Sequence, residues 1–467
     1  MTQNVKLFTF ILIFKGGGCM GAQKKKVAVI GGGPAGMEAA LTAARYDCEV
    51  TLITDSHPGD WKMAGTAAWL QAIASLSPYA GIEALSPRRI NEAAQDVIRQ
   101  CAASAAEQLR AAGVSVQYGR ARFQSAQVLT VAQEQGKSVD IHADLIFIAN
   151  GARPHFPEAM RPDGRHIYSY TTLTDMERLP ASVIVVGDGP IGYEAVNLFS
   201  RFGVPVDWLV EANGPRCFFD PDIDAWLTGL FQRRHVNIRP GERVKAIHRQ
   251  DRRVTAIRED GAEQEAEAAF VTLGFRPNVD QLNIEAAGLA LNGYGSVDCN
   301  PFGQTAIPSI YIAGDAQRTM AGVYSIAMAR AAALHAVGRT PEPVDVQTIP
   351  FAFNDAPEVA TVGLPDAGAP GIHSRVVNYN AERNGTAILQ GETEGFLKLL
   401  WNDEGRIVGG TAVGLQAKHM ISTVAMMIRF KLGIGDCQLL MGAHPSVSEL
   451  LVHTLHAIHD QHAGGES

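Results

Sequence analysis

A glycine-rich segment near the start of the chain has the spacing of a dinucleotide-binding turn. Gly31, Gly33 and Gly36 form G-x-G-x-x-G directly after the apolar run 27–30, and helix-favouring residues follow. In such a turn Gly31 permits the tight bend, Gly33 lets a pyrophosphate approach the backbone, and Gly36 lets helix and strand pack closely. The N-terminus of the helix then offers free N–H groups and a positive dipole end to the phosphates.

The same spacing recurs in the middle of the chain. Gly187, Gly189 and Gly192 follow the apolar run 183–186, and Glu194 lies just beyond them. Two dinucleotide sites in one chain suggest two dinucleotides that exchange electrons. The alternative is a pair of glycine turns in unrelated α/β units, which the strand and helix around both turns disfavour.

The elements around these two fingerprints are predicted as βαβ units. In the first unit, strands at 27–30 and 49–54 flank a helix over about 37–46. In the second, a helix leads into a strand at 206–210. A long helix is expected over 88–112, since a serine and a proline precede it in the N-cap and first helical positions. Further strands are expected at 114–117, 129–131, 143–151, 310–315, 357–362, 396–401 and 407–413, and further helices at 325–337, 417–430 and 446–459.

Composition limits the partners and the compartment. The chain of 467 residues is long enough for about two to four domains. Its net charge of −8 gives no reason to expect nucleic acid or an anionic membrane as a partner. The six cysteines form no C-x-x-C or C-x4-C pair, so neither a metal site nor a close redox pair is predicted. We expect a cytoplasmic protein with reduced thiols.

The first 24 residues are predicted to be an extension outside the folded domains. Their apolar run at 5–14 is too short to span a bilayer, and Lys15 with three glycines follows where a signal peptide needs a cleavage site. Our hypothesis is that the natural chain begins at Met20 and that residues 1–19 come from a wrongly assigned start codon.

Taken in order, the motifs resemble those of the pyridine nucleotide–disulfide oxidoreductases, the family of dihydrolipoamide dehydrogenase, glutathione reductase and mercuric reductase. The resemblance covers 25–460. It rests on GGGPAG at 31–36, ANG at 149–151, GDGPIGYE at 187–194, GFRPN at 274–278, IYIAGD at 310–315, PEVATVG at 357–363 and HPSVSE at 444–449.

The resemblance implies an α/β fold with two Rossmann-like dinucleotide-binding domains and a C-terminal α+β dimerisation domain. An FAD-binding domain of 25–151 and 273–340 would be split by an NAD(P)-binding domain of 152–272. The dimerisation domain, 346–467, would build a homodimer. The implied cofactors are FAD and either NAD(H) or NADP(H).

Individual roles also follow from the resemblance. The first fingerprint would hold the FAD pyrophosphate and the second the NAD(P)H pyrophosphate. Asp315 would accept a hydrogen bond from the ribityl chain of the flavin, and Glu194 would lie near the contact of flavin and nicotinamide. Asp315 as a helix cap and Glu194 as a first-turn acid are the alternatives. The remaining cofactor-binding residues implied are Pro34, Ala35, Gly151, Ile191, Gly274, Arg276 and Gly314.

The chain departs from the family at its redox-active disulfide. Depending on the alignment, the two cysteine positions hold Trp61 and Thr66 or Lys62 and Ala67. None of these side chains can shuttle electrons as two thiolates do. Lys62 is a candidate for the cation that Glu194 would otherwise lose, or an ordinary surface lysine. Trp61 and a second tryptophan, eight residues later, either flank the flavin or serve as core anchors.

The acids that would bind the two riboses are displaced by one residue. The expected positions hold Thr54 and Val210, and Asp55 and Glu211 follow them. A one-residue shift reverses side-chain direction in a strand, so either a bulge restores each contact or the contact is lost. Arg216 is the nearest candidate for a 2′-phosphate contact, and NADH is favoured over NADPH.

The C-terminal motif is retained. His444 and Glu449 match the family's H-P-x-x-x-E, with Ser446 at the usual threonine position. In the family the histidine is the base for the dithiol and the glutamate orients it. Here His444 could protonate a reduced product, or the pair is inherited dimer packing. A solvated helix is favoured over a metal site for the tail histidines His453, His456, His459 and His462.

The sequence therefore predicts an FAD-dependent NAD(P)H oxidoreductase that passes hydride through FAD to a small non-disulfide acceptor such as a quinone or another electrophile. His444, Glu449 and Glu194 are its predicted catalytic residues. A nicotinamide transhydrogenase is one alternative. A flavin electron-transfer subunit with a protein redox partner, or a non-catalytic nucleotide-binding relative, is another.

Overall fold

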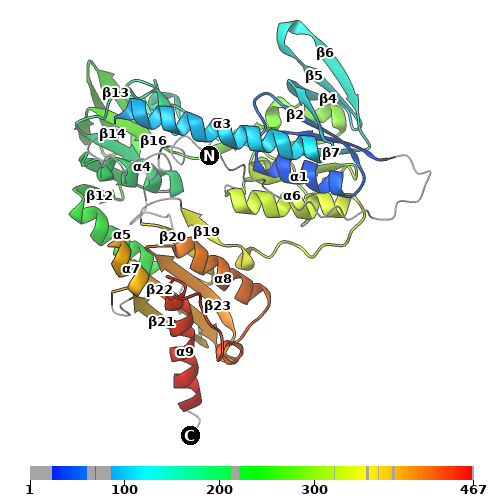
Figure 1. The fold of residues 1–467 in the computed structure, drawn as a ribbon. Coiled ribbons are helices and arrows are strands. Elements are labelled where there is room, and N and C mark those ends of the chain that lie inside the picture. The colour runs from blue at the N-terminus through cyan, green and yellow to red at the C-terminus, as the bar shows by residue number, and fades with distance from the viewer. Residues whose placement is uncertain are drawn as a thin grey trace, which may run out of the picture.

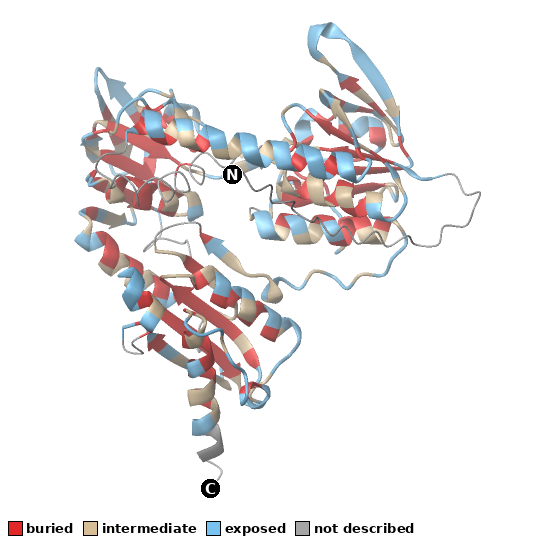
Figure 2. Cartoon of the chain, viewed as in Figure 1, coloured by how far each residue is buried: buried red, intermediate tan, exposed pale blue. Residues whose placement is uncertain are grey.

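Three lobes, each built on its own sheet, make up the computed structural model (Figure 1). In each lobe the buried residues lie mainly along the sheet and the inner faces of its helices (Figure 2). No helix in the described part of the chain is long and apolar enough to cross a bilayer. The structure describes residues 24–59, 69, 86–211, 220–319, 321–353, 357–365, 368–380 and 384–464.

The first lobe contains a five-stranded parallel sheet of order β18-β7-β1-β2-β3. Helices α1 (Pro34–Arg45) and α6 (Gly322–Ala336) pack on one face, and a three-stranded meander covers the other. Since β18 follows the whole second lobe in sequence, the chain returns to complete the first sheet. The strands are β1 (Lys26–Ile30), β2 (Glu49–Thr54), β3 (Ser115–Tyr118), β7 (Leu145–Ile148) and β18 (Ile310–Ile312), and those of the meander β4 (Arg120–Ser125), β5 (Val128–Ala132) and β6 (Ser138–His142).

The second lobe repeats this plan with a parallel sheet of order β12-β11-β10-β16-β9. Helices α4 (Pro190–Arg201) and α5 (Pro221–Arg233) pack with it. The chain enters through β8 (Ala152–Pro154) and leaves through β17 (Phe275–Pro277), which pair antiparallel. The other strands are β9 (Ile167–Tyr168), β10 (Val183–Val186), β11 (Val206–Val210), β12 (Val236–Pro240) and β16 (Ala268–Val271), and those of the meander β13 (Val244–Gln250), β14 (Arg253–Arg258) and β15 (Glu263–Ala266).

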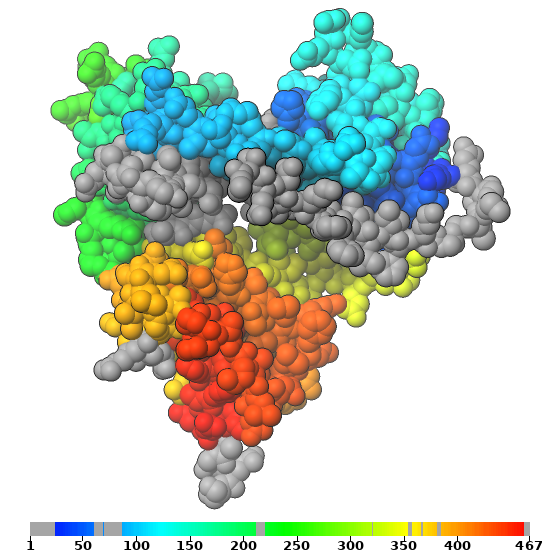
Figure 3. Space-filling model, viewed as in Figure 1, coloured from blue at the N-terminus to red at the C-terminus, as the bar shows by residue number. Residues whose placement is uncertain are grey.

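One helix, α3 (Pro87–Ala111), connects the first two lobes (Figures 1 and 3). The Ser86 hydroxyl caps its start by accepting the N–H of Arg89 at 3.4 Å. Ile90 and Ala94 in its first half join the core of the second lobe, whereas Leu109 near its end joins the core of the first. The same helix is therefore part of both cores.

The C-terminal lobe has an antiparallel sheet of order β19-β20-β23-β22-β21. Helices α8 and α9 pack into the core of this lobe, and only the C-terminal end of α9 extends beyond the sheet (Figure 1). The strands are β19 (Phe351–Phe353), β20 (Val359–Gly363), β21 (Ile372–Asn378), β22 (Phe396–Asn402) and β23 (Ile407–Val413), and the helices α7 (Gly385–Gln390), α8 (Ala417–Arg429) and α9 (Glu449–Gly464).

A buried ion pair joins the C-terminal lobe to the second lobe. Lys398 on β22 places its Nζ 2.6 Å from Oδ1 of Asp220 and 2.7 Å from Oδ2 of Asp222. Thr411 on β23 donates to the other Asp220 oxygen at 2.6 Å. Asp220 is also the N-cap of α5, where it accepts the N–H of Asp222. Two lobes thus share one fully hydrogen-bonded carboxylate.

A second acid near this contact titrates unusually. Asp224 is half-buried on the first turn of α5 and lines a small cavity with Tyr193 and Trp208. Burial and the nearby charge of Asp220 raise the pKa of Asp224 to about 6. Because the folded protein holds this proton more tightly than the unfolded chain, stability falls as the pH rises from about 4 to about 6.

We expect Asp224→Asn to remove this part of the pH dependence. Above pH 6 the variant should be more stable than the wild type by about 1 kcal/mol, a value reduced for the partial exposure of the group. Urea denaturation at pH 4.5 and pH 7 measures the difference. Equal gains at both pH values would contradict the assignment.

The predicted elements differ from the structure mainly at helix ends. Strands β2 and β11 coincide with their predicted ranges, and the predicted start of α1 at 37 is three residues late because Pro34 occupies the first turn. The last helix was expected to start at Ser446 but starts at Glu449, whose carboxylate accepts the Ser446 N–H in the preceding turn. Several elements were not predicted, among them helices α5 and α7 and strands β4, β6, β12 and β21.

Candidate functional site

The first fingerprint assigns different tasks to its three glycines. Gly31 has φ +116°, and a Cβ there would lie 2.2 Å from the Ala149 carbonyl oxygen. A Cβ on Gly36 would lie 1.8 Å from the oxygen of Gly31. Gly33, by contrast, has no atom within 4 Å of its Cβ position. The open space over Gly33, at the N-terminus of α1, suits a pyrophosphate.

The second fingerprint has the same construction. A Cβ on Gly187 would lie 2.0 Å from the Thr272 oxygen, and one on Gly192 would lie 2.4 Å from the oxygen of Gly187. The space over Gly189, at the N-terminus of α4, is again open. The Trp208 indole donates to the Gly187 oxygen at 2.8 Å and holds the turn in place.

A pair of substitutions should separate the two sites. We expect Gly33→Val to weaken FAD binding by about tenfold or more, because the side chain fills the phosphate space without a clash in the protein itself. Gly189→Val should weaken NAD(P)H binding in the same way and leave FAD bound. Fluorescence titration of each purified variant measures both affinities, and each variant is the other's control. Wild-type FAD affinity in Gly33→Val would contradict the assignment.

Asp315 lies in the turn after β18 and is held from one side. Its Oδ1 accepts hydrogen bonds from Thr319 at 3.1 Å and Ser325 at 3.2 Å. No described residue donates to its second oxygen. The adjacent Gly314 has φ +72°, and a Cβ there would lie 2.7 Å from the Cβ of Ala35, so this turn lies against the first fingerprint. Helix α6 begins well beyond Asp315, so the alternative role as its N-cap is wrong.

Two buried acceptors near Asp315 also have no protein partner. Oδ1 of Asn150, just after β7, and Oε1 of Gln317, just after β18, make no hydrogen bond within the described residues. Strands β7 and β18 are parallel neighbours, so these residues follow the same edge of the sheet. Buried polar atoms normally find partners, and ligands of such sheets bind at the carboxyl edge. These acceptors fit a ligand with several hydroxyls, and the open helix N-terminus at Gly33 fits a pyrophosphate, both of which FAD has.

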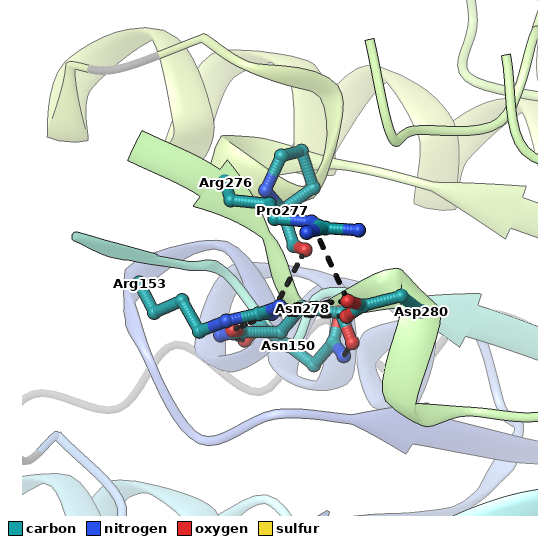
Figure 4. Close-up of polar contacts among 6 residues, drawn as sticks. All are labelled: Asn150, Arg153, Arg276, Pro277, Asn278 and Asp280. Atoms are coloured by element: carbon teal, nitrogen blue, oxygen red, sulfur yellow. Dashed lines mark hydrogen bonds and ion pairs between the residues drawn. The ribbon is translucent and has the colours of Figure 1, made fainter. Parts of the chain in front are cut away.

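The two strands that cross between the lobes are tied by a polar network (Figure 4). Arg153 donates to both carboxylate oxygens of Asp280, at 2.9 and 2.7 Å, and lowers the pKa of that acid. Asn150 and Asn278 exchange hydrogen bonds between side chain and backbone at 3.0 and 2.9 Å. Arg276, a predicted cofactor contact, is half-exposed and pairs with Asp280 at 3.5 Å. The network fixes the entry and exit of the second lobe.

The other predicted cofactor residues lie in the same turns. Pro34 is the first residue of α1, and the half-buried Ile191 lies in the first turn of α4. Gly151 and Gly274 have φ +67° and +109° and lie beside β8 and β17. Glu194 follows on α4 and is half-buried. Their contacts with cofactors remain predictions.

The two displaced acids lie just beyond their strands. The ladders of β2 and β11 continue without a bulge in the described pairs. Asp55 is exposed and lies 3.6 Å from Arg120, and Glu211 is exposed and paired with Arg243. The bulge that would restore the ribose contacts is therefore not present in these ladders. Ribose binding by either acid stays a prediction.

The C-terminal pair forms as predicted. Nδ1 of His444 lies 2.8 Å from Oε1 of Glu449, while the other Glu449 oxygen accepts the Ser446 N–H at 3.0 Å. Both contacts lower the pKa of Glu449, and the hydrogen bond from the Ser446 backbone has the larger effect. The His444 side chain is 83% exposed in the single chain. The carboxylate thus holds one ring nitrogen and leaves the other facing outward.

Several predicted residues fall outside the described residues: Trp61, Lys62, Thr66, Ala67 and Arg216. Trp69 is described and lies in the second-lobe core, where its indole donates to Asn91, which in turn donates to the Thr174 oxygen. It is therefore a core anchor, the alternative given above. Among the described residues, no three His, Cys, Asp or Glu side chains are placed to hold a metal ion.

Sequence reasoning missed Asn150, Arg153 and Asp280, although Asn150 lies within a recognised motif. It also missed Lys398, for which a signal existed. A single lysine in the apolar run of residues 396–401 requires a buried partner, because an unpaired charge in a core is costly.

Comparison with known proteins identifies the family of this chain. Residues 25–336 match the family described as "Pyridine nucleotide-disulphide oxidoreductase", and residues 349–455 match its dimerisation domain. The chain is 26% identical over 455 residues to "NAD(P)H dehydrogenase (quinone)" of Mycobacterium tuberculosis, covering 91% of this chain and 92% of that protein. It is 28% identical over 447 residues to "Dihydrolipoyl dehydrogenase" of Chlorobaculum parvum, covering 91% and 94%.

Solved structures give the same result. The crystal structure of LpdA from Mycobacterium tuberculosis superposes with a TM-score of 0.86 at 25% identity, covering 93% of this chain and 99% of that one. The flavoprotein disulfide reductase RclA from Escherichia coli shares the fold, with a TM-score of 0.81 at 22% identity over 93% and 99% of the two chains. The chain belongs to the pyridine nucleotide-disulphide oxidoreductase family and is an FAD- and NAD(P)H-dependent oxidoreductase.

Proposed function

We propose that this enzyme passes reducing equivalents from NAD(P)H through FAD to a small acceptor that is not a disulfide, with a quinone as the leading case. The observation that carries the proposal is the absence of any C-x4-C pair from the whole sequence. The four described cysteines are all free thiols, which also fits a cytoplasmic location. The relative named as a quinone dehydrogenase supports this acceptor class.

The chain's own residues would divide the work. The two fingerprints bind the pyrophosphates, and Asp315 orients a hydroxyl of the first dinucleotide. When bound, FAD supplies the hydride and electron transfer chemistry. His444, oriented by Glu449 through one ring nitrogen, would hold at its other nitrogen the proton that a reduced quinone needs.

A homodimer is part of this proposal. The C-terminal lobe exposes several large apolar side chains, a pattern that marks contact surfaces. The family's dimerisation domain matches this part of the chain. In such a dimer the exposed His444 would serve the acceptor site of the partner. The exposed apolar side chains are those of Met426, Phe430, Leu439, Leu440 and Met441.

Anaerobic titration with NADH tests the missing disulfide. We expect one equivalent of NADH per FAD to complete the reduction, with no long-wavelength band from a thiolate beside the flavin. The reason is that the sequence has no C-x4-C pair to serve as a second two-electron couple. Consumption of a second equivalent, together with such a band, would contradict the proposal.

Steady-state assays then separate the acceptors. Turnover of NADH with menadione by the purified protein alone supports the proposal. Turnover only with a second nicotinamide nucleotide would indicate a transhydrogenase. If NADH reduced the flavin but turnover occurred only after a protein partner was added, the chain would be an electron-transfer subunit. Purified protein that contains no flavin would indicate a non-catalytic relative.

A further inference from the structure

Tyr170 carries a buried hydroxyl group that the protein leaves unsatisfied. The residue lies in the loop after β9, is 3% exposed, and its hydroxyl has no hydrogen-bond partner among the described residues. Tyr168, two residues earlier, is 7% exposed, but its hydroxyl donates to the Arg165 oxygen at 2.5 Å. A buried hydroxyl without a partner is costly, so the Tyr170 hydroxyl calls for a ligand that accepts its hydrogen bond.

The surroundings of Tyr170 bring both nucleotide-binding lobes together. Its ring packs against Phe275 on β17, with the ring centroids 5.5 Å apart. Burial, and in addition the charge of Asp315, raise the pKa of Tyr170, so its hydroxyl stays protonated and able to donate. Tyr170 belongs to the second lobe, whereas Asp315 lies at the carboxyl edge of the first sheet.

Other unsatisfied polar atoms lie toward the same junction. Asn150, which has one unpaired oxygen, is hydrogen-bonded to Asn278, three residues after Phe275. Gln317, which also has an unpaired oxygen, lies two residues after Asp315. Several described buried side chains have a polar atom without a hydrogen-bond partner. Among those at this junction, only Tyr170 offers a donor group. One polar ligand at this junction would satisfy all three.

We propose that the Tyr170 hydroxyl donates a hydrogen bond to the flavin end of bound FAD. Tyr170 is then a positioning residue through which the second lobe contacts the cofactor of the first. The inference rests on FAD binding, which is part of the proposed function, but it is independent of which acceptor the enzyme reduces.

Tyr170→Phe, with Tyr168→Phe as its matched control, tests the inference. Both apoproteins are reconstituted with FAD, and the affinity, the visible flavin spectrum and the apoprotein Tm are recorded. Tyr170→Phe should bind FAD about two- to tenfold more weakly and shift the flavin bands. Its apoprotein Tm should be unchanged or higher, because the unsatisfied hydroxyl is gone. Tyr168→Phe should lower the Tm and leave FAD binding unchanged.

The two variants are expected to change the FAD affinity and the apoprotein Tm in different ways, so their comparison decides between a ligand contact and a structural role. Wild-type FAD affinity and spectrum in Tyr170→Phe would overturn the inference, as would an affinity loss for NADH instead of FAD. A lower apoprotein Tm with unchanged flavin properties would indicate a purely structural tyrosine. If the enzyme turned over with none of the acceptors, the proposed function would fail, but the FAD-binding measurements on Tyr170→Phe could still be made. The two proposals are therefore tested separately.

Wild-type protein offers a second measurement in case the variant does not fold. Adding FAD to the apoprotein should slow amide hydrogen exchange in the segment 168–173, because the new hydrogen bond anchors that loop. Adding NADH alone should not. Unchanged exchange in this segment after FAD binding would overturn the inference.

Discussion

His444→Gln is expected to lower quinone turnover by about 10²- to 10⁴-fold, the usual contribution of a positioned proton donor. The structure gives the reason, since Glu449 holds Nδ1 of His444 at 2.8 Å and leaves the other ring nitrogen outward. Glutamine occupies similar space but cannot deliver a proton. Reduction of the flavin by NADH should keep its wild-type rate, because it precedes the step that needs this proton.

Stopped-flow absorbance separates the two half-reactions. The reductive half follows flavin bleaching by NADH, and the oxidative half follows its return with menadione. Glu449→Gln should slow only the oxidative half, by about tenfold, since the imidazole is still present but less well oriented. His419→Gln, which changes an exposed histidine on α8, is the matched control and should change neither rate.

Equal oxidative rates in His444→Gln and the wild type would contradict the assignment. The His444–Glu449 contact would then be inherited packing of the dimer surface. Gel filtration of the same variants distinguishes these cases, because a packing role predicts weaker dimers, whereas a proton-donor role predicts unchanged ones.

Lys398→Met is expected to destabilise the protein by about 3–5 kcal/mol. The substitution leaves Asp220 buried without the cation that lies 2.6 Å away in the wild type. Thr411 still donates to Asp220, but one neutral donor does not balance a buried charge. Because the pair joins two lobes, the loss should appear as earlier separation of the C-terminal lobe in urea.

The double variant Lys398→Met with Asp220→Asn should recover much of this loss, because no fully buried charge is then left unpaired and Asp222 is half-exposed. Arg429→Met is the control. Arg429 pairs with Glu342 on the surface, at 2.6 Å, and the variant should lose less than about 1 kcal/mol. If the double variant lost as much stability as the two single variants together, the broken ion pair would not be the cause of the instability.

The local parts of the fold and the site were predictable from the sequence. Both fingerprints and strands such as β11 follow from short-range rules, since backbone clashes demand glycine at Gly31 and Gly187. The His444–Glu449 contact is also local, because the two residues are five positions apart. For such features the residue types and their spacing contain the physical cause.

Contacts between distant segments were not predictable. Lys398 meets Asp220 across 178 positions and Arg153 meets Asp280 across 127. A single chain carries no pattern that pairs such residues, since each has an ordinary alternative on a surface. Tyr170 is harder still, because what marks it is a hydroxyl left without a partner after folding.

A single 25-residue helix, about 37 Å long, has its two ends embedded in different hydrophobic cores. It acts as a strut. The lobes cannot swing apart without bending this rod or pulling one end into water, either of which is unfavourable. The helix therefore restricts changes in the spacing between the two lobes that carry the glycine fingerprints.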